Sequence, residues 1–396
     1  MRKTKKIITF FTIFSLILAI FLPFNGTGAA EKQTRVIVSF KGSLSNSQRE
    51  QVIKGAGFRG SMDHFGQGSV MSVNKSVFNK LKKNNNVAYV EEDVKIYSLR
   101  RIGGPQIQQP IATTSWGFKE LDAENAWTIS TGKGLGVKVA VIDTGISMIH
   151  PDLKVAGGVN TISPNGKYND DNGHGSHVAG IIASQENNFG TTGIAPNVSL
   201  YAVKALDKNG SGYLSGIIRG VEWSINNKMD IINLSMGFDT DSSILHDMII
   251  KAKDAGITVV VAAGNEGPDT DSITYPAKYP EVIAVSAITS DKSIASWSSN
   301  GAEVDLAAPG ENIISTYGSR GYAVESGTSM AAPFVAGVAA LIKNTSIPSG
   351  YDTNSNGKWE PDEIMNKLGN SATDLGASGS DNYYGSGLVN AYNAVK

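Results

Sequence analysis

The sequence predicts an α/β protein with a mainly parallel sheet that carries helices on both faces, preceded by a small α+β unit. Three observations support this prediction. After residue 112, short β-branched runs alternate with helical stretches, which is the pattern of a parallel sheet covered on both sides. Hydrophobic residues make up 41% of the 396 residues, enough to form a large core. The 44 glycines suit tight turns between strands and helices.

The small N-terminal unit is expected at residues 31–99. A helix over residues 45–56 begins at a cap formed by Ser45 or Asn46. The remaining elements are strands at 35–40, 70–73 and 87–90 and a helix at 76–83. These elements predict a small α+β unit, a sheet with two helices.

The larger unit is expected over residues 112–396. Strands are predicted at 138–142, 199–205, 231–236, 258–263 and 282–287, and helices at 174–184, 213–226, 242–255 and 329–343. The strands are near-continuous apolar runs, which indicates burial on both faces. Open α/β sheets place their functional groups at the carboxyl ends of such strands.

Residues 1–30 have the features of a cleaved secretion signal. Arg2, Lys3, Lys5 and Lys6 precede an apolar run over residues 7–24, and small residues lead to Ala30. The alternative is a membrane anchor, because the apolar run is close to the length that spans a bilayer. Pro23 and the small residues favour cleavage after Ala30, after which no membrane contact is expected.

Charge and cysteine content limit the function classes. The sequence has no cysteine, so an exported chain must be stabilised by its core and by metal ions rather than by disulfides. Residues 31–99 carry a net charge of +5 and residues 100–396 a net charge of −10. Opposite charges would help the two units to dock, although unrelated surface composition is the alternative. The negative charge makes nucleic acid an improbable partner.

A serine suited to nucleophilic chemistry lies in the segment Gly327-Thr328-Ser329-Met330-Ala331-Ala332-Pro333. Small residues around Ser329 allow close backbone approach. The helix that follows offers free N–H groups and the positive end of its dipole to developing negative charge. A serine alone is a poor nucleophile and needs a base and an orienting acid.

The sequence supplies such partners upstream of Ser329. Asp143 ends a predicted buried strand, and His174 opens a predicted helix between two glycines. Asn265 follows another buried strand and can donate its amide to an oxyanion. A metal site at His174 and His177 is disfavoured, because no glutamate follows the first histidine as in a zinc-protease helix.

These four segments, in this order, resemble the subtilase family of secreted bacterial serine endopeptidases, and the similarity runs from about residue 35 onward. The resemblance implies that Ser329 is the nucleophile, that His174 is the general base, and that Asp143 orients the base. It also implies an oxyanion hole formed by the Asn265 amide and the Ser329 backbone N–H. One departure is Ser176, where the family pattern usually has threonine.

The resemblance also implies a domain organisation. Residues 31–99 would be an inhibitor-type propeptide of ferredoxin-like fold, an intramolecular folding assistant and inhibitor, and residues 100–396 the catalytic domain. Self-cleavage is expected after about Leu99, so that the preceding residues occupy the active site as first product. Another protease could instead cut at the dibasic pair Arg100-Arg101. Residues 100–111 would be a linker or a trimmed N-terminus.

Substrate-binding residues follow from the same resemblance. Gly210-Ser211-Gly212 resembles the edge that pairs with an extended substrate backbone, and Ser235-Met236-Gly237 resembles the opposite edge and one wall of the S1 pocket. Ala262-Ala263-Gly264 would be the other wall. Thr274 stands where many relatives have a glycine at the pocket floor, and Phe238 replaces a glycine near the rim. We therefore expect a preference for medium apolar P1 residues such as Leu or Met.

Calcium is the cofactor that the resemblance implies. The segment Gln185-Glu186-Asn187-Asn188-Phe189-Gly190-Thr191 resembles the family's strong calcium loop. Asn187 and Asp152 would supply side-chain oxygens, and the carbonyls of Gln185, Phe189 and Thr191 would supply the rest. The family's N-terminal glutamine ligand aligns with Ala112, and Gln108 or Gln109 could reach the site in its place.

Two further cation sites are expected. Glu303 and Asp305, with carbonyls near Ala277 and Tyr279, suggest one of them. The other is the segment Asp352-Thr353-Asn354-Ser355-Asn356-Gly357-Lys358-Trp359-Glu360-Pro361-Asp362-Glu363, which fits a known calcium-loop pattern at every required position. Its ligands would be Asp352, Asn354, Asn356, the Lys358 carbonyl and Glu363. The alternative is an acidic turn before the last helix.

The sequence therefore predicts a secreted, calcium-stabilised, monomeric subtilisin-like endopeptidase that acts on proteins and peptides and is made as a precursor. Two other functions stay open on the sequence alone. One is a non-catalytic secreted binding protein on the same fold, which the filled catalytic positions disfavour. The other is a membrane-tethered processing protease that retains its leader.

Overall fold

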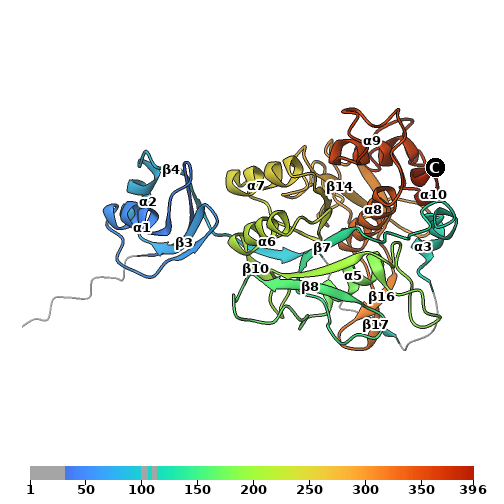
Figure 1. The fold of residues 1–396 in the computed structure, drawn as a ribbon, viewed down its shortest axis with the longest axis horizontal. Helices are drawn as coiled ribbons and strands as arrows, with labels where there is room; N and C mark the ends of the chain where they lie inside the picture. Colours follow the sequence, from blue (N-terminus) through green and yellow to red (C-terminus); the bar gives the residue numbers. More distant parts are fainter. Residues whose placement is uncertain (1–31, 100–105, 109–113) are drawn as a thin grey trace, which may run out of the picture.

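The computed structural model describes residues 32–99, 106–108 and 114–396. The chain forms a small N-terminal unit and a larger α/β body, which lie side by side and are joined by an extended segment (Figure 1). The N-terminal unit contacts helices α6 (Leu214–Asn226) and α7 (Ser243–Asp254) of the larger body near their N-termini.

The N-terminal unit has the predicted ferredoxin-like arrangement. Its elements are β1 (Thr34–Phe40), α1 (Asn46–Gly55), β2 (Asp63–Phe65), β3 (Gly68–Val73), α2 (Lys75–Lys82) and β4 (Val87–Glu92). The antiparallel sheet has the order β2-β3-β1-β4. Ser45 caps α1 in a capping box with Gln48, as the sequence indicates. The three-residue strand β2 is too short to be recognised from the sequence.

The larger body is built on a seven-stranded sheet in the order β15-β14-β13-β11-β7-β9-β8. Every neighbouring pair in this sheet is parallel. The strands are β7 (Lys138–Asp143), β8 (Val155–Asn160), β9 (Ser199–Lys204), β11 (Ile231–Leu234), β13 (Thr258–Ala262), β14 (Ile283–Ile288) and β15 (Leu306–Pro309). The strands predicted from apolar runs are all present, with small shifts at their ends.

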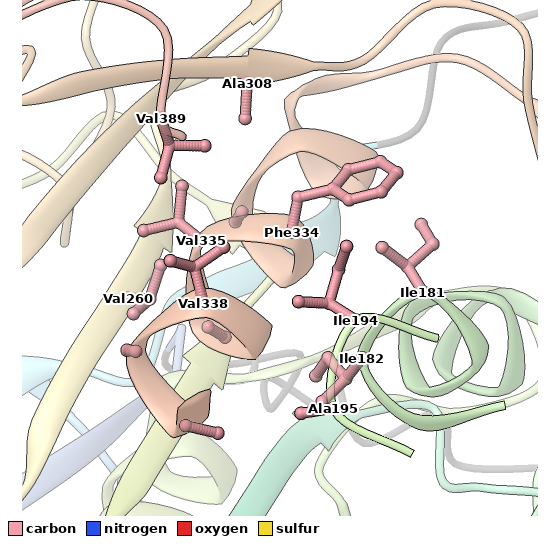
Figure 2. Packing of buried hydrophobic residues seen from close by; sticks show 14 of the residues in the cluster. Ile181, Ile182, Ile194, Ala195, Val260, Ala308, Phe334, Val335, Val338 and Val389 are labelled. Carbon is pink, nitrogen blue, oxygen red and sulfur yellow. The ribbon is translucent and has the colours of Figure 1, made fainter. Parts of the chain in front are cut away.

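Helices cover both faces of this sheet, as predicted. Alternate strand residues pack into separate cores, so that Val141 belongs to the core under α5 (His174–Ala183) and α8 (Thr328–Lys343), whereas Ile142 belongs to the core under α6 and α7. Figure 2 shows the first of these cores, where Phe334 and Val335 of α8 lie among residues from several other elements. Burial on both faces explains why the strands read as continuous apolar runs.

Several elements were not predicted. β8 contains two glycines in succession, and the hairpin β16 (Ile313–Tyr317) and β17 (Gly321–Glu325) mixes polar and apolar residues, so neither shows a clear period. The helices α3 (Trp116–Glu120), α4 (Ala123–Ala126) and α10 (Ala391–Val395) are too short for a helical period to be recognised. α9 (Pro361–Ser371) begins at the proline, as the sequence suggests.

Two short sheets involve the segment that leaves the N-terminal unit. β5 (Lys95–Ser98) lies between β10 (Ser211–Tyr213) and β12 (Met236–Gly237) of the larger body, antiparallel to both. β6 (Gln106–Gln108) pairs with β17. Of the ranges that the structure describes, none contains a helix long and apolar enough to cross a bilayer. The predicted signal at residues 1–30 lies outside these ranges, as does most of the predicted linker at 100–111.

Candidate active site

The predicted polar residues lie at the carboxyl edge of the parallel sheet. Asp143 is the last residue of β7, and β7 lies between β9 and β11, where the strand order reverses direction. Ser235 directly follows β11, and Asn265 lies three residues beyond β13. Ligands of open α/β sheets bind at such a reversal, at the carboxyl ends of the strands. The fold therefore brings loops from three neighbouring strands to one edge.

Asp143 and His174 form a direct hydrogen-bonded pair. His174 Nδ1 lies 2.8 Å from Asp143 Oδ1 and 2.9 Å from Oδ2, and both side chains are fully buried. The chain can turn sharply into α5 because Gly173 has a φ of 112°, a left-handed conformation. A Cβ at Gly173 would also lie 2.3 Å from the ring of Tyr317. A carboxylate at Nδ1 leaves Nε2 as the nitrogen available for proton transfer.

Ser329 lies in the first turn of α8, which packs against α5, the helix that His174 opens. The Ser329 hydroxyl donates to the Ser235 carbonyl at 3.0 Å. Pro333 cannot donate the helical hydrogen bond to the Ser329 carbonyl, because proline has no N–H. That carbonyl instead accepts from the Ser235 hydroxyl at 3.0 Å. Ser329 is thus tied to the loop after β11 through both its side chain and its backbone.

Asn265 points its amide group at the end of the N-terminal unit. Its Nδ2 donates to the Leu99 carbonyl oxygen at 2.6 Å. Its Oδ1 accepts from the Thr328 backbone N–H at 2.9 Å and from the Thr328 hydroxyl at 3.0 Å. Because Thr328 binds the oxygen, the Nδ2 end must face Leu99. In the sequence Thr328 is recognisable only as a neighbour of Ser329, and nothing there indicates its contact with Asn265.

The segments predicted as substrate edges enclose β5 between them. Ser98 N donates to the Gly210 carbonyl at 3.0 Å, and β5 pairs with Ser211 and Gly212. On the other side Leu99 N donates to the Ser235 carbonyl at 3.2 Å, and Met236 and Gly237 pair with β5. The last residues of the N-terminal unit therefore fill an extended groove of the larger body.

A cavity of about 630 Å³ opens beside Leu99, and Gly237, Phe238 and Thr274 are among its lining residues. A Cβ added to Gly237 would lie 3.0 Å from the Leu99 side chain and 2.3 Å from the Thr274 hydroxyl oxygen. Thr274 and Phe238 are both buried, and the peptide bond Tyr275–Pro276 is cis.

Ala262 and Gly264, predicted as a pocket wall, do not line this cavity. Ala262 packs its side chain into the core under α5 and α8. Gly264 has a φ of 126°, and a Cβ there would lie 2.5 Å from the Ser299 hydroxyl oxygen, so the position requires glycine.

The residues of the predicted strong calcium loop lie together around a buried carboxylate. Asp152 is fully buried, and its oxygens accept from Asn187 Nδ2 at 2.9 Å, from Thr191 N at 3.0 Å and from the Tyr322 hydroxyl at 3.2 Å. Burial raises the pKa of Asp152 above its ordinary value. Asn187 Oδ1 accepts from Phe189 N at 3.0 Å, so the amide presents nitrogen to Asp152. Gln185 N donates to the Asp152 carbonyl.

The two predicted residues of the weaker cation site point in different directions. Asp305 directs its carboxylate at the backbone N–H of Ala284 in β14, 2.8 Å away, and burial raises its pKa to about 6. Glu303 is exposed. Ala277 and Tyr279 are buried, and within the described chain neither forms a hydrogen bond with these carboxylates.

In the loop at residues 352–363, side-chain oxygens accept hydrogen bonds from backbone N–H groups of the same loop. Asp352 accepts from the backbone N–H groups of Asn356 at 3.0 Å and Gly357 at 3.1 Å. Asn354 Oδ1 accepts from Asn356 N, and Asn356 Oδ1 accepts from Lys358 N.

Glu363, at the end of this loop, is 1% exposed and accepts from Thr353 and from Glu360 N. These hydrogen bonds outweigh burial and lower its pKa. Within the described residues, no three His, Asp or Glu side chains are grouped in a way that would hold a metal ion.

Two further residues near the Asp143–His174 pair were missed by the sequence analysis. Thr144 and Asp170 are both buried, and their side chains are hydrogen bonded to each other. The only sequence signal was the position of Asp170 in an acidic pair four residues before His174.

Comparison with known proteins identifies the relatives of this chain. Residues 134–387, which include all four predicted catalytic positions, match the subtilase family. Subtilisin E of Bacillus subtilis (strain 168) is 39% identical over 399 residues, covering 97% of this chain and 97% of that protein. A thermostable alkaline protease of Halalkalibacterium halodurans is 43% identical over 322 residues, 81% of each chain.

The minor extracellular protease Epr of Bacillus subtilis (strain 168) is 40% identical over 324 residues, or 81% of this chain. The chain spans about half of that relative, 48% of its length.

Proposed function

The chain belongs to the subtilase family and is a serine endopeptidase, and from this premise we propose that it is exported as a precursor, removes its own N-terminal unit and then hydrolyses proteins. The observation that carries the proposal is the position of Leu99. Its carbonyl oxygen lies 2.6 Å from Asn265 Nδ2, and the residues before it are paired on both edges of the groove. A peptide held in this way is held as a substrate.

The proposed chemistry is acyl transfer on a peptide bond. Ser329 Oγ attacks the scissile carbonyl carbon, and its proton passes to His174 Nε2, which later protonates the leaving amine. Asp143 fixes the tautomer and orientation of His174 and stabilises the imidazolium. The 2.8 Å contact between Asp143 and His174 supports these roles, and the chain order Asp, His, Ser is that of subtilisins.

The negative charge that develops on the substrate oxygen needs donors that are already in place. We assign this role to Asn265 Nδ2 and to the backbone N–H of Ser329 in the first turn of α8. A first-turn N–H has no helical acceptor and is therefore available. The contact of Asn265 with the Leu99 carbonyl supports this assignment.

The N-terminal unit, residues 31–99, is proposed to be an inhibitory propeptide that the enzyme cleaves after Leu99. Glu91 accepts from the Ser242 hydroxyl at the start of α7, and Asp93 accepts from Ser215 N and its hydroxyl at the start of α6. These carboxylates cap two helices of the larger body, which favours docking. Cleavage by another protease at Arg100-Arg101 is the alternative, and these residues lie outside the described ranges.

A matched pair of proteins tests the catalytic and maturation proposals together. Wild type and Ser329→Ala, purified alike, are assayed with a peptide anilide in calcium and in chelator. We expect wild type to mature and to release the chromophore, and Ser329→Ala to stay inactive and uncut. Equal activity of the two proteins would refute the assignment of Ser329. Two inactive but folded proteins would instead favour a non-catalytic binding function.

The S1 pocket is proposed to accept medium apolar P1 residues, with Leu99 as the internal example. The cavity beside Leu99 is narrowed by Thr274 and Phe238. Anilides that differ only in P1 test this, and Thr274→Gly should shift the preference toward larger side chains. A wild-type enzyme that prefers a charged P1 residue would contradict the proposal.

Export is proposed to depend on residues 1–30, with signal cleavage after Ala30. The name of one relative, the minor extracellular protease Epr, includes the word extracellular. The chain has no cysteine, so its stability does not depend on disulfides. N-terminal sequencing of the secreted precursor of Ser329→Ala should find Glu31. A retained Met1 would indicate a membrane-tethered protease instead.

Calcium is proposed to bind around Asp152. This carboxylate is buried, and it pairs with no Lys or Arg in the described part of the chain, so a cation would compensate its charge. Carboxylate, side-chain amide and backbone carbonyl oxygens, which this loop contains, are the ligands that Ca²⁺ prefers. The Asn187 amide would have to turn so that Oδ1 faces Asp152. When bound, calcium would act as a structural ion that stabilises the folded enzyme.

The loop 352–363 is proposed as a second calcium site. The side-chain oxygens of Asp352, Asn354 and Asn356 lie in one turn, and Gly357, with a φ of 71°, permits it. Glu363 would have to exchange its contacts with Thr353 and Glu360 for the ion. Chelation should expose the C-terminal region to proteolysis. If Asp352→Ala, Glu363→Ala leaves local proteolysis unchanged with and without calcium, this second site is ruled out.

A further inference from the structure

Asp170 lies in the loop before α5 and is 8% exposed, but the chemistry proposed above does not use it. Its carboxylate accepts five hydrogen bonds. Oδ1 accepts from the Thr144 hydroxyl, Asn172 N and Gly173 N at 2.9 Å each. Oδ2 accepts from Ser176 N at 2.9 Å and from the Ser176 hydroxyl at 2.6 Å. Within the described ranges no Lys or Arg pairs with it, so these dipoles alone compensate its charge.

One arm of this network leads to Asp143. Thr144 N donates to Asp143 Oδ1 at 2.6 Å, while the Thr144 hydroxyl donates to Asp170. The Thr144 carbonyl is held by Lys204 Nζ at 2.7 Å. Thr144 is therefore fixed at its amide, its side chain and its carbonyl. The orientation of the N–H that binds Asp143 depends on the bond to Asp170.

The other arm leads to His174. The first turn of α5 has free N–H groups that need acceptors. Gly175 N donates to the Thr144 hydroxyl oxygen at 2.9 Å, and Ser176 N donates to Asp170. His174 N donates to Asn172 Oδ1, and Asn172 N donates to Asp170. The backbone that carries His174 is thus held on both sides by groups that Asp170 binds.

We propose that Asp170 is a positioning residue for the reaction. Its buried carboxylate binds both the loop that follows Asp143 and the first turn of α5, which carries His174. The inference rests on the proposed roles of Asp143 and His174. Asp170 does not touch substrate and moves no proton. It keeps the carboxylate at His174 Nδ1, so that the imidazolium formed during catalysis is stabilised. A simple helix cap would contribute to stability but not to the properties of His174.

Asp170→Asn tests this proposal. The asparagine amide has the shape of the carboxylate, but its NH2 group replaces one of the two acceptor oxygens and so faces N–H or O–H groups that need an acceptor. Each variant is produced as the full chain, and active sites are counted by fluorophosphonate titration. We expect kcat to fall by about 10- to 100-fold while KM stays within about twofold, as for a misplaced catalytic group. The apparent pKa on the acid side of the kcat/KM profile should fall, because the imidazolium is less stabilised.

Control variants separate positioning from charge and from capping. Asp171→Asn removes the same charge one residue away, from a carboxylate that binds Lys204 and not α5. Lys204 keeps its bonds to the Thr144 and Leu206 carbonyls in this variant. Ser176→Ala removes a donor to Asp170 but leaves the Thr144 bond. Both should keep kcat within about threefold of wild type. Thr144→Val removes only the link to Asp170 and Gly175, and should reproduce most of the kcat and pKa effects.

The outcomes are distinguishable. If Asp170→Asn lowers the melting temperature but leaves kcat and the pKa unchanged, Asp170 is only a helix cap and the proposal is wrong. If Asp170→Asn does not fold, Thr144→Val decides the question, and normal kinetics in that variant overturn the proposal. A Ser329→Ala protein that retained activity would instead overturn the proposed function itself.

Discussion

Thr328 determines which end of the Asn265 amide faces the groove. It binds Oδ1 through its backbone N–H and its hydroxyl, and so leaves Nδ2 toward the Leu99 carbonyl. The sequence identifies Asn265 by its place after a buried strand. The partner that orients it lies 63 positions later and is recognised only in the structure.

We predict that Asn265→Ala lowers kcat by about 10²–10³ with little change in KM, the loss known for the corresponding asparagine of a subtilisin. Thr328→Val should give a smaller loss of kcat, because the backbone N–H still binds Oδ1. Thr328→Ser retains the hydroxyl and serves as the matched control. Steady-state kinetics on a peptide anilide measure all three, and equal rates for Thr328→Val and wild type would contradict the orienting role.

His177 makes folding sensitive to acid. Burial lowers its pKa below the ordinary value of 6.5, and its Nε2 contacts the Ile313 and Ala323 carbonyls at 3.0 Å. The unfolded chain takes up a proton at His177 below about pH 6.5, whereas the folded chain resists it. This contribution to stability is therefore present above the unfolded pKa and is lost as pH falls, by up to about 1.4 kcal/mol per pH unit.

Melting temperatures of Ser329→Ala, which cannot digest itself, should thus fall as the pH is lowered from about 7 to 5. Adding His177→Gln should lower stability at neutral pH but reduce this slope. Burial also lowers the pKa of His150, so part of the dependence of melting temperature on pH should remain in the His177→Gln variant. An unchanged slope would show that His177 does not carry the acid sensitivity.

At the scale of elements, the N-terminal unit meets the larger body at two helix starts. Asp93 is fully buried and binds Ser215 N at 2.8 Å, the Ser215 hydroxyl at 2.7 Å and Arg35 Nε at 2.6 Å. Loss of one partner in a buried charged contact costs several kcal/mol, because the other charge is left unpaired.

We therefore predict that Asp93→Asn weakens inhibition of the mature enzyme by a separately produced 31–99 segment by at least about tenfold. Glu92→Gln is the matched control, because it removes the same charge from the adjacent, exposed position. Inhibition constants measure the effect. If both variants inhibit equally well, the cap at the start of α6 does not contribute to docking.

At the scale of the whole molecule, the two parts of the chain carry net charges of opposite sign. Residues 31–99 carry +5 and residues 100–396 carry −10. The individual contacts do not follow these signs, because Glu91 and Asp93 of the positive unit bind helix starts of the negative body, and Arg219 of the body pairs with Asp63 of the unit. We therefore expect net charge to act on the approach of the two units rather than on the interface itself.

Raising the salt concentration should accordingly slow association of a separate 31–99 segment with the mature enzyme, with little effect on its dissociation. Stopped-flow measurement of inhibition onset at several ionic strengths gives both rates. An association rate that does not depend on salt would favour the alternative that the two compositions are unrelated.

The sequence by itself determined the fold class, the order of the main strands and helices, and the identity of the catalytic candidates. The buried strands are continuous apolar runs. Asp143 ends one of them, Asn265 follows another, and His174 and Ser329 lie at helix starts, so these four segments are recognised from local sequence and from their resemblance to the subtilase family. The sequence also shows a glycine at 173, but its left-handed φ, which only glycine readily adopts, is known from the structure.

Only the tertiary structure decided which side chains hold the candidates in place. Asp170 and Thr144 are 26 positions apart, and Asn265 and Thr328 are 63 apart, so no local pattern connects them. The same holds for Glu91 and Asp93, whose partners are helix N-termini more than a hundred residues away. Hydrogen bonds between distant segments depend on how the sheet and helices pack, and packing brings together residues that the chain keeps apart.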